Sequence, residues 1–196
     1  MKQFLILLLA CSFCLPSFSQ AIKHEDFKEI IPLLKGEKYR EAFTESRRLL
    51  DSTAKDSSLL RAFVSYMSII SAAGMVSVNQ MDREQFAQYA EGFVGQPLIM
   101  PAHPCIDSSA KGFNSFQFIN SNGAPEGMTI ATNSKATNIL LFEYYHYDEK
   151  PDVSKFLGQT VRAGGFLNKV EVNPRDSGIW IARLYLRNAF TIIAKP

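Results

Sequence analysis

The sequence predicts an α+β protein in which a helical N-terminal part is followed by a small antiparallel β part. From His24 to Glu91, apolar residues recur every three to four positions, which is the period of a helix. From Asn114 onward, short runs rich in β-branched and aromatic residues alternate with turn residues, which is typical of strands. The predicted organisation is a signal peptide at 1–20, a helical domain at 21–95, a linker at 96–110 and a β domain at 111–196.

The first residues have the layout of a secretory signal peptide. Lys2 precedes an apolar run that is too short to span a bilayer comfortably, and Pro16 ends this run before small residues. We therefore expect cleavage near Ser19 or Gln20, a secreted or periplasmic protein, and no later segment apolar for long enough to cross a membrane. An alternative is a lipoprotein acylated at Cys11.

Charge and cysteine content set further limits. The formal net charge is +2, so net charge alone indicates no acidic partner. Cleavage of the signal peptide would remove Cys11 and Cys14 and leave Cys105 as the remaining cysteine. No intramolecular disulfide could then form, and stability would come from a hydrophobic core. The glycine-containing stretches lack the lysine and helix start of a phosphate-binding loop, and we expect no cofactor and no metal.

The helical part is predicted to contain a central helix with helices packed around it. The central segment, 56–74, is apolar on most sides and is expected to be buried. Pro32 should kink the first helix or shift its start, because proline lacks the N–H that a helix interior requires. Asp82 is expected to cap the last helix. The predicted helices are 24–36, 37–52, 56–74 and 83–93.

The stretch "GEKYREAFTESRRLL" resembles the second half of a tetratricopeptide repeat. In that pattern a glycine precedes an aromatic residue and a small alanine packs between helices, which corresponds to Gly36, Tyr39 and Ala42. The resemblance covers about a third of the helical part. It implies helical hairpins that serve as a scaffold for protein interaction.

Beyond 95–107, which is rich in proline, the sequence predicts strands of a small sandwich or barrel. Asn122-Gly123 is a strong turn signal between two of these strands. The predicted strands are 114–120, 128–133, 137–147, 159–172, 179–188 and 190–196.

The stretch "FLGQTVRAGGFLNKVEV" is similar to the first strand of an oligonucleotide/oligosaccharide-binding (OB) barrel. That strand is long and bends sharply at glycine, and Gly164-Gly165 lies at the middle of this stretch. The resemblance covers residues from Lys155 onward. It implies a small barrel that binds a ligand.

The strand "IWIARLYLRN" has two different faces. Trp180, Ala182, Leu184 and Leu186 form an apolar face that we expect in the core. The opposite face carries Arg183, Tyr185 and Arg187 beside two isoleucines, Ile179 and Ile181. If the strand pairs with 159–172, Arg162 and Phe166 lie on the same outer face. The predicted binding residues are therefore Arg162, Phe166, Arg183, Tyr185 and Arg187.

This outer face combines cations with aromatic rings. From Lys155 to Pro196, basic residues outnumber acidic ones by five. Cations neutralise phosphates or carboxylates, and rings stack on bases or sugars. Secretion makes a protein, peptide or glycan partner more plausible than nucleic acid, and the alternative interpretation is an ordinary solvated sheet face.

Two other groups of residues invite a catalytic interpretation. His103 and Cys105 could share a face of an extended segment, and with His146 they could support a thiol nucleophile. His-x-Cys alone supplies at most two of the ligands that zinc requires. Asp148 and Glu149 are paired carboxylates, but Pro151 follows closely and places them in a turn, where solvated charges are the ordinary case.

The sequence therefore favours a non-enzymatic binding or assembly module. In this hypothesis the helical part contacts a protein and the basic–aromatic β face contacts a second partner. The alternatives are a thiol-dependent hydrolase or transferase using Cys105 with His103 or His146, and a structural component of the cell envelope.

Overall fold

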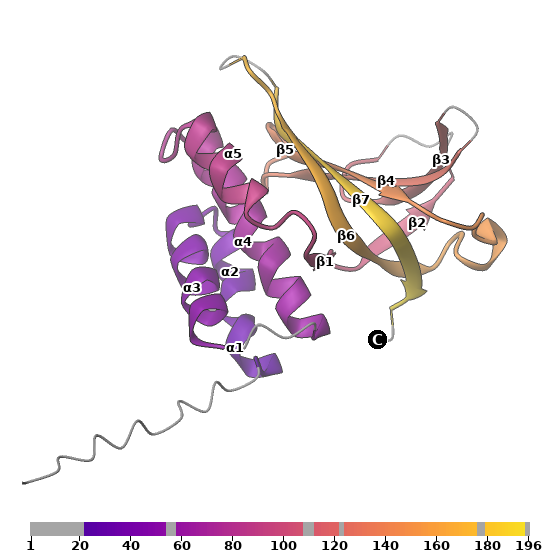
Figure 1. The fold of residues 1–196 in the computed structure, drawn as a ribbon, viewed down its shortest axis with the longest axis horizontal. Helices are drawn as coiled ribbons and strands as arrows, with labels where there is room; N and C mark the ends of the chain where they lie inside the picture. The colour runs from indigo at the N-terminus through magenta and orange to yellow at the C-terminus, as the bar shows by residue number, and fades with distance from the viewer. Residues whose placement is uncertain (1–21, 54–57, 108–111, 122–123, 176–178, 195–196) are drawn as a thin grey trace, which may run out of the picture.

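The computed structural model describes residues 22–53, 58–107, 112–121, 124–175 and 179–194. It confirms the α+β class, with helices in the N-terminal half and a mixed sheet in the C-terminal part (Figure 1). The predicted signal peptide and its cleavage site, Cys11 and the Asn122-Gly123 turn lie outside the described residues. The helices are α1 (His24–Lys28), α2 (Ile30–Lys35), α3 (Tyr39–Ser52), α4 (Leu59–Ser77) and α5 (Arg83–Glu91).

Helix α4 is the centre of the helical layer, as its composition predicts. Most of its side chains are buried, and the Ser58 side chain caps its start by accepting a hydrogen bond from the Arg61 backbone N–H. Helix α3 packs closely on α4 because Gly74 leaves room for the ring of Tyr39: a Cβ at Gly74 would lie 2.2 Å from that ring. The Asp82 cap of α5 is also confirmed, as part of a capping box with Gln85.

Pro32 shifts the start of its helix, which was one of the two expected outcomes. The segment predicted as a single helix is divided at Glu29 into α1 and α2. Pro32 then lies in the first turn of α2, where a backbone N–H has no intrahelical acceptor in any case.

Length and composition alone would allow α4 to cross a membrane, although no segment after residue 20 was expected to be apolar for long enough. Its most apolar window is 78% buried within the protein. Helices α3 and α5 and the sheet cover it, so α4 has the surroundings of a core helix.

The sheet consists of β1 (Pro97–Ile99), β2 (His103–Ile106), β3 (Phe116–Ser121), β4 (Ala124–Thr132), β5 (Ile139–His146), β6 (Thr160–Val172) and β7 (Trp180–Ile193). A short 3₁₀ helix, Val153–Lys155, precedes β6. Strand β6 pairs with β1 and β2, and also with β7. The pairing continues from β2 through β3, β4 and β5 to β7. In Figure 1 the helices lie on one side of this sheet, and β1 lies next to α4.

The expectation of a purely antiparallel β part is wrong, because β2 pairs with β3 and β5 pairs with β7 in parallel. Turn signals in the sequence report hairpins between consecutive strands. They carry no information about which strands distant in sequence become neighbours. Here β7 forms a hairpin with β6 and also pairs in parallel with β5, which no turn signal could have indicated.

The segment expected to be a linker contains two strands. Strands β1 and β2 lie within 96–110, and both pair with β6. The prolines there are compatible with pairing, since both strands are short and Pro97 is the first residue of β1.

The two strands predicted over 179–188 and 190–196 form a single strand, β7. Asn188 has a φ of 48°, in the left-handed region that asparagine tolerates, and the pairing with β6 shifts there. Gly164 pairs with Phe190 and Phe166 pairs with Arg187, so β7 contains one more residue than β6 across this interval. The break that the sequence suggested near Asn188 is therefore a β-bulge.

Candidate ligand-binding surface

The outer face of the β6–β7 pair depends on two bulges. Before Asn188, Arg183, Tyr185 and Arg187 face outward, whereas after it Phe190 and Ile192 do so, and Ile181, expected on the outer face, is 4% exposed. A second shift, between Leu167 and Lys169, adds a residue to β6 and turns Lys169 outward opposite Tyr185. Simple alternation along β6 predicts that Lys169 lies on the inner face, so Lys169 was not among the predicted binding residues.

The structure separates the predicted binding residues into two groups. Arg183 pairs with Glu171 near one end of β6, whereas Arg162 pairs with Ile192 near the other end. At a strand rise of about 3.3 Å per residue, Arg162 and Glu171 are about 30 Å apart along β6. Phe166 and Arg187 are direct cross-strand partners, and they lie about midway between these two ends.

The end that contains Arg183 is neutralised within the protein. Arg183 Nη1 donates to Glu171 Oε1 at 2.9 Å, and the Tyr185 hydroxyl donates to Glu171 Oε2 at 3.0 Å. Lys169 Nζ lies 3.8 Å from the same carboxylate. Burial and the neighbouring Glu171 carboxylate raise the pKa of Tyr185. Glu171 thus engages Arg183 and Tyr185, both of which were expected to meet a ligand, together with Lys169.

Aromatic rings cover the rest of this end. Tyr144 of β5 stacks on Tyr185 with ring centroids 5.2 Å apart. The Arg183 guanidinium lies 4.5 Å from the centre of the Trp180 ring, which also meets Phe142 edge to face. Trp180 was expected in the core, but it is half-buried and its ring contacts residues of the outer face. Trp180 is the first residue of β7, so no paired residue before it in the strand holds its side chain toward the core.

The other end is exposed and has no counter-charge. We call its residues the β6–β7 patch: Arg162, Phe166, Arg187, Phe190 and Ile192. Phe166 is 43% exposed, Phe190 36% and Ile192 49%. Both arginines are exposed, and among the described residues neither has an ion pair or a side-chain hydrogen bond. Single exposed apolar residues are ordinary, but several on one strand pair with two unpaired cations form a surface that can hold a ligand.

Gly164 allows this patch to form, because two groups approach its backbone. A Cβ there would lie 2.6 Å from the Leu98 carbonyl oxygen of β1 and 2.7 Å from the Phe190 ring. The Phe190 ring therefore lies directly over the β6 backbone. The close strand contact that Gly164-Gly165 suggested is confirmed at this position.

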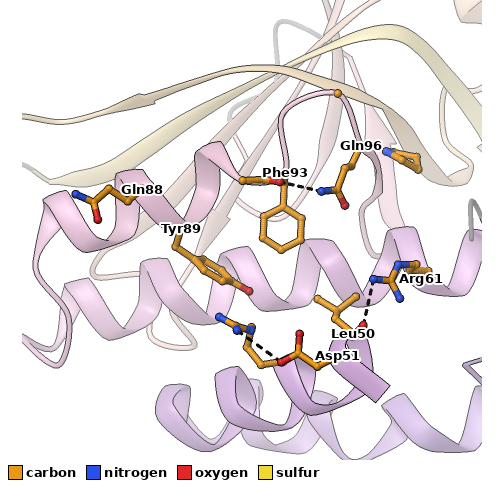
Figure 2. A pocket seen from close by; sticks show the side chains of 11 residues that line it. Leu50, Asp51, Arg61, Gln88, Tyr89, Phe93 and Gln96 are labelled. Atoms are coloured by element: carbon orange, nitrogen blue, oxygen red, sulfur yellow. Dashed lines mark hydrogen bonds and ion pairs between the residues drawn. The ribbon is translucent and has the colours of Figure 1, made fainter. Parts of the chain in front are cut away.

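The patch adjoins a groove in the helical layer. Pro97 pairs with Phe166, and Pro97 also lines a groove of about 710 Å³ between α3, α5 and the start of β1. Figure 2 shows Tyr89 of α5 and Phe93, just after this helix, pointing toward Leu50 and Asp51 of α3 across this groove.

The polar groups of the groove are mostly engaged already. Arg47 pairs with Asp51 at 3.6 Å and lies 5.4 Å from the centre of the Tyr89 ring. Arg61 donates to the Leu50 carbonyl oxygen near the end of α3. The groove therefore offers apolar side chains and Gln88 more than free charges.

The thiol candidates do not form a catalytic arrangement. Cys105 is 1% exposed, and burial raises the pKa of its thiol, whereas a nucleophilic cysteine needs a lowered pKa. His103 Nδ1 lies 3.1 Å from the Asn114 carbonyl oxygen, and burial lowers the pKa of its imidazole. His146 lies on exposed β5 surface near Glu126. Within the described residues, no group of His, Cys, Asp and Glu could hold a metal ion.

The sequence interpretation did not include one buried carboxyl group, that of Glu143. Glu143 is 1% exposed, and its carboxyl accepts hydrogen bonds from Tyr66 of α4 and Thr129 of β4. Its position in the strand gave a signal, because Leu141 and Tyr145 share its alternation and are both buried.

Comparison with known proteins gives no relative: no protein-family model, no curated protein and no solved structure matches this chain.

Proposed function

We propose that this protein is a secreted or periplasmic, non-enzymatic binding module whose β6–β7 patch binds an acidic polypeptide segment that carries apolar side chains. The observation that carries the proposal is the pairing of two unneutralised arginines, Arg162 and Arg187, with exposed Phe166, Phe190 and Ile192.

The chemistry of the patch selects this class of partner. Within the described parts of β6 and β7, no acidic residue flanks the patch between 160 and 168 or between 187 and 194. A carboxylate of a partner would therefore meet Arg162 or Arg187 without competition from an acidic side chain in these parts of β6 and β7. Phenylalanine rings bury much area and lose few rotatable bonds, so they favour contact with apolar side chains.

The helical groove is proposed as an extension of this surface for the same or a second protein partner. Pro97 belongs to both regions through its pairing with Phe166. The proposed similarity to tetratricopeptide hairpins is supported by Tyr39 and Ala42, which are 3% and 0% exposed and pack where such hairpins place an aromatic residue and a small one.

The β part is proposed to be OB-like. Strand β6 has neighbours on both sides and carries adjacent glycines at the closest backbone approaches, which supports the proposal. The sequence resemblance covered only the β6–β7 hairpin, whereas an OB barrel has five strands. Strands β2 to β5, which connect β6 to β7 in the sheet, could supply the remaining ones. An OB-like barrel would be compatible with a glycan or a single strand, which the test below separates from a peptide.

The secreted or periplasmic location is proposed from the first twenty residues alone.

The buried thiol of Cys105 supports a binding function over the thiol-dependent hydrolase or transferase, since a catalytic sulfur must reach its substrate. Acylation at Cys11 and a structural envelope role stay alternatives.

The test is selection of a random-peptide display library on the purified protein, followed by affinity measurement of the selected peptides at low and raised salt. We expect peptides in which acidic residues flank aromatic or aliphatic ones. Arg162→Glu with Arg187→Glu should weaken their binding at least tenfold, and raised salt should weaken binding to the unaltered protein.

Arg183→Gln is the matched control, because it also removes an arginine from the outer face but one that Glu171 already neutralises. Its affinity should stay within about twofold of the unaltered protein. Selected peptides without acidic enrichment, or equal binding by the double variant, would reject the proposed ligand. Tighter binding of an acidic oligosaccharide or an oligonucleotide in a parallel titration would assign the patch to that class.

A further inference from the structure

Glu143 joins the helical layer to the sheet through a buried hydrogen-bond network. The Tyr66 hydroxyl of α4 donates to Glu143 Oε1 at 2.8 Å, and the Thr129 hydroxyl of β4 donates to the other carboxyl oxygen. The Tyr145 hydroxyl lies 2.9 Å from Thr129. Tyr66, Thr129, Glu143 and Tyr145 are each at most 1% exposed. A single carboxyl group thus connects α4, β4 and β5.

No cation among the described residues balances this carboxyl group. The titratable neighbours that act on its network are tyrosines, Tyr66 from α4 and Tyr145 from β5. A cavity of about 360 Å³ beside Tyr66 is also lined by His103 of β2 and Lys35 of α2. Burial lowers the pKa of His103, which keeps that imidazole neutral near pH 7, and Lys35 is exposed at the surface.

The environment of Glu143 favours its protonated form. Burial raises the pKa of the carboxyl group from 4.5 to about 7, although the hydrogen bonds from Thr129 and Tyr66 oppose part of this rise. Ionisation in place would leave a buried charge with no partner ion, which is costly in a medium of low dielectric constant. Water can solvate that charge only if the junction between α4 and the sheet opens.

We propose that Glu143 is a pH-sensitive lock between α4 and the sheet, closed when the carboxyl group is protonated and loosened when it is ionised. The lock is one helical turn from the β6–β7 patch: Phe63, three residues before Tyr66 in α4, carries the Arg162 guanidinium 5.7 Å above its ring. The inference concerns the α4 junction and does not depend on the ligand of the patch.

The sign of the pH dependence follows from linkage. Between pH 4.5 and about 7 the folded protein holds a proton on Glu143 that the unfolded chain has released. The contribution of Glu143 to folding stability is therefore fully present below pH 4.5. It decreases as the pH rises through this window, and it changes little above about pH 7. The folding equilibrium constant should fall by up to about 300-fold across the window, the factor that corresponds to a pKa difference of this size.

The first experiment is urea unfolding from pH 4 to pH 9 of the unaltered protein, Glu143→Gln and the control Glu149→Gln. Glu149 is exposed, so its substitution makes the same chemical change without altering the lock. We expect Glu143→Gln to lose the fall in stability between pH 4.5 and 7 and to exceed the unaltered protein above pH 7. An unchanged pH profile in Glu143→Gln, or a flat profile in the unaltered protein, would overturn the proposal.

A second experiment remains decisive if Glu143→Gln does not fold. Carboxyl ¹³C NMR of the unaltered protein should show one glutamate titrating near pH 7, and Tyr66→Phe should raise that pKa further, because the Tyr66 hydroxyl stabilises the ionised form. Hydrogen exchange should show α4 amides losing protection from pH 5.5 to pH 8 beyond the intrinsic rate change. Absence of a glutamate titrating near pH 7, or equal α4 protection at both pH values, would reject the lock.

Discussion

The two ends of the β6–β7 pair carry similar residues but offer different chemistry to a partner. At one end Glu171 forms ion pairs with Arg183 and Lys169 and accepts a hydrogen bond from the Tyr185 hydroxyl. At the other end Arg162 and Arg187 have no ion pair among the described residues. A basic–aromatic pattern in sequence therefore does not by itself define a binding face.

The difference arises from a single carboxylate and two bulges. Glu171 faces outward opposite Arg183 only because the bulge after Leu167 resets the alternation of β6. The bulge at Asn188 likewise turns Phe190 and Ile192 outward instead of Ala189 and Thr191. Backbone irregularities thus decide which charges meet each other and which stay available to a ligand.

The largest effect on stability is expected from substitution of Gly164, which lies at the exposed end of the β6–β7 pair. In Gly164→Ala the new Cβ would displace the Leu98 carbonyl or the Phe190 ring, so we expect a loss of about 2–4 kcal/mol in unfolding free energy by urea titration. Gly92→Ala is the control, since Gly92 has an ordinary helical backbone conformation and should change stability by less than about 1 kcal/mol. Equal effects of the two substitutions would show that the close approach at Gly164 is unimportant.

The next effect concerns the bulge that separates the two ends. A β-branched residue strongly disfavours a positive φ, so Asn188→Val should lower the unfolding free energy by about 1–2 kcal/mol. Asn188→Gly, which accepts this conformation freely, should stay within about 0.5 kcal/mol of the unaltered protein. Thermal unfolding of the two variants measures the difference, and a well-tolerated valine would contradict the bulge.

A smaller effect compares one arginine from each end. Arg183→Gln removes an ion pair whose side chains are 35% and 36% exposed, so it should cost about 0.5–1 kcal/mol, and less at high salt. Arg162→Gln removes no ion pair and should cost less than about 0.5 kcal/mol. Urea titrations at low and raised salt test the contrast, which would fail if Arg162 proved the more important for stability.

The smallest effect sharpens the description of the neutralised end. Tyr185→Phe removes one hydrogen bond to Glu171 and should cost about 0.5–1 kcal/mol while the stack on Tyr144 persists. In a spectrophotometric pH titration, the same variant should remove a tyrosine whose pKa lies above its usual value. A Tyr185→Phe variant as stable as the unaltered protein would mean that Glu171 is held by Arg183 alone.

The sequence by itself determined the features that depend on local preference. The apolar character of 56–74 indicated a central helix, Asp82 indicated a cap, and the run 159–172 indicated a long strand. It also placed Phe166 and Arg187 on the same outer face of the β6–β7 pair. These features follow from the helix period, capping chemistry and strand alternation, each of which acts over a few neighbouring residues.

Only the tertiary structure decided the parallel pairing of β5 with β7, the strands within 96–110, the separation of Arg162 from Arg183 and the burial of Glu143. Each depends on contacts between residues that are distant in sequence. Alternation predicts a face only until a bulge inverts it, and charges at outward positions stay free only if no carboxylate faces them across the strand. The bulges and cross-strand neighbours therefore determine which of these residues form the proposed binding surface.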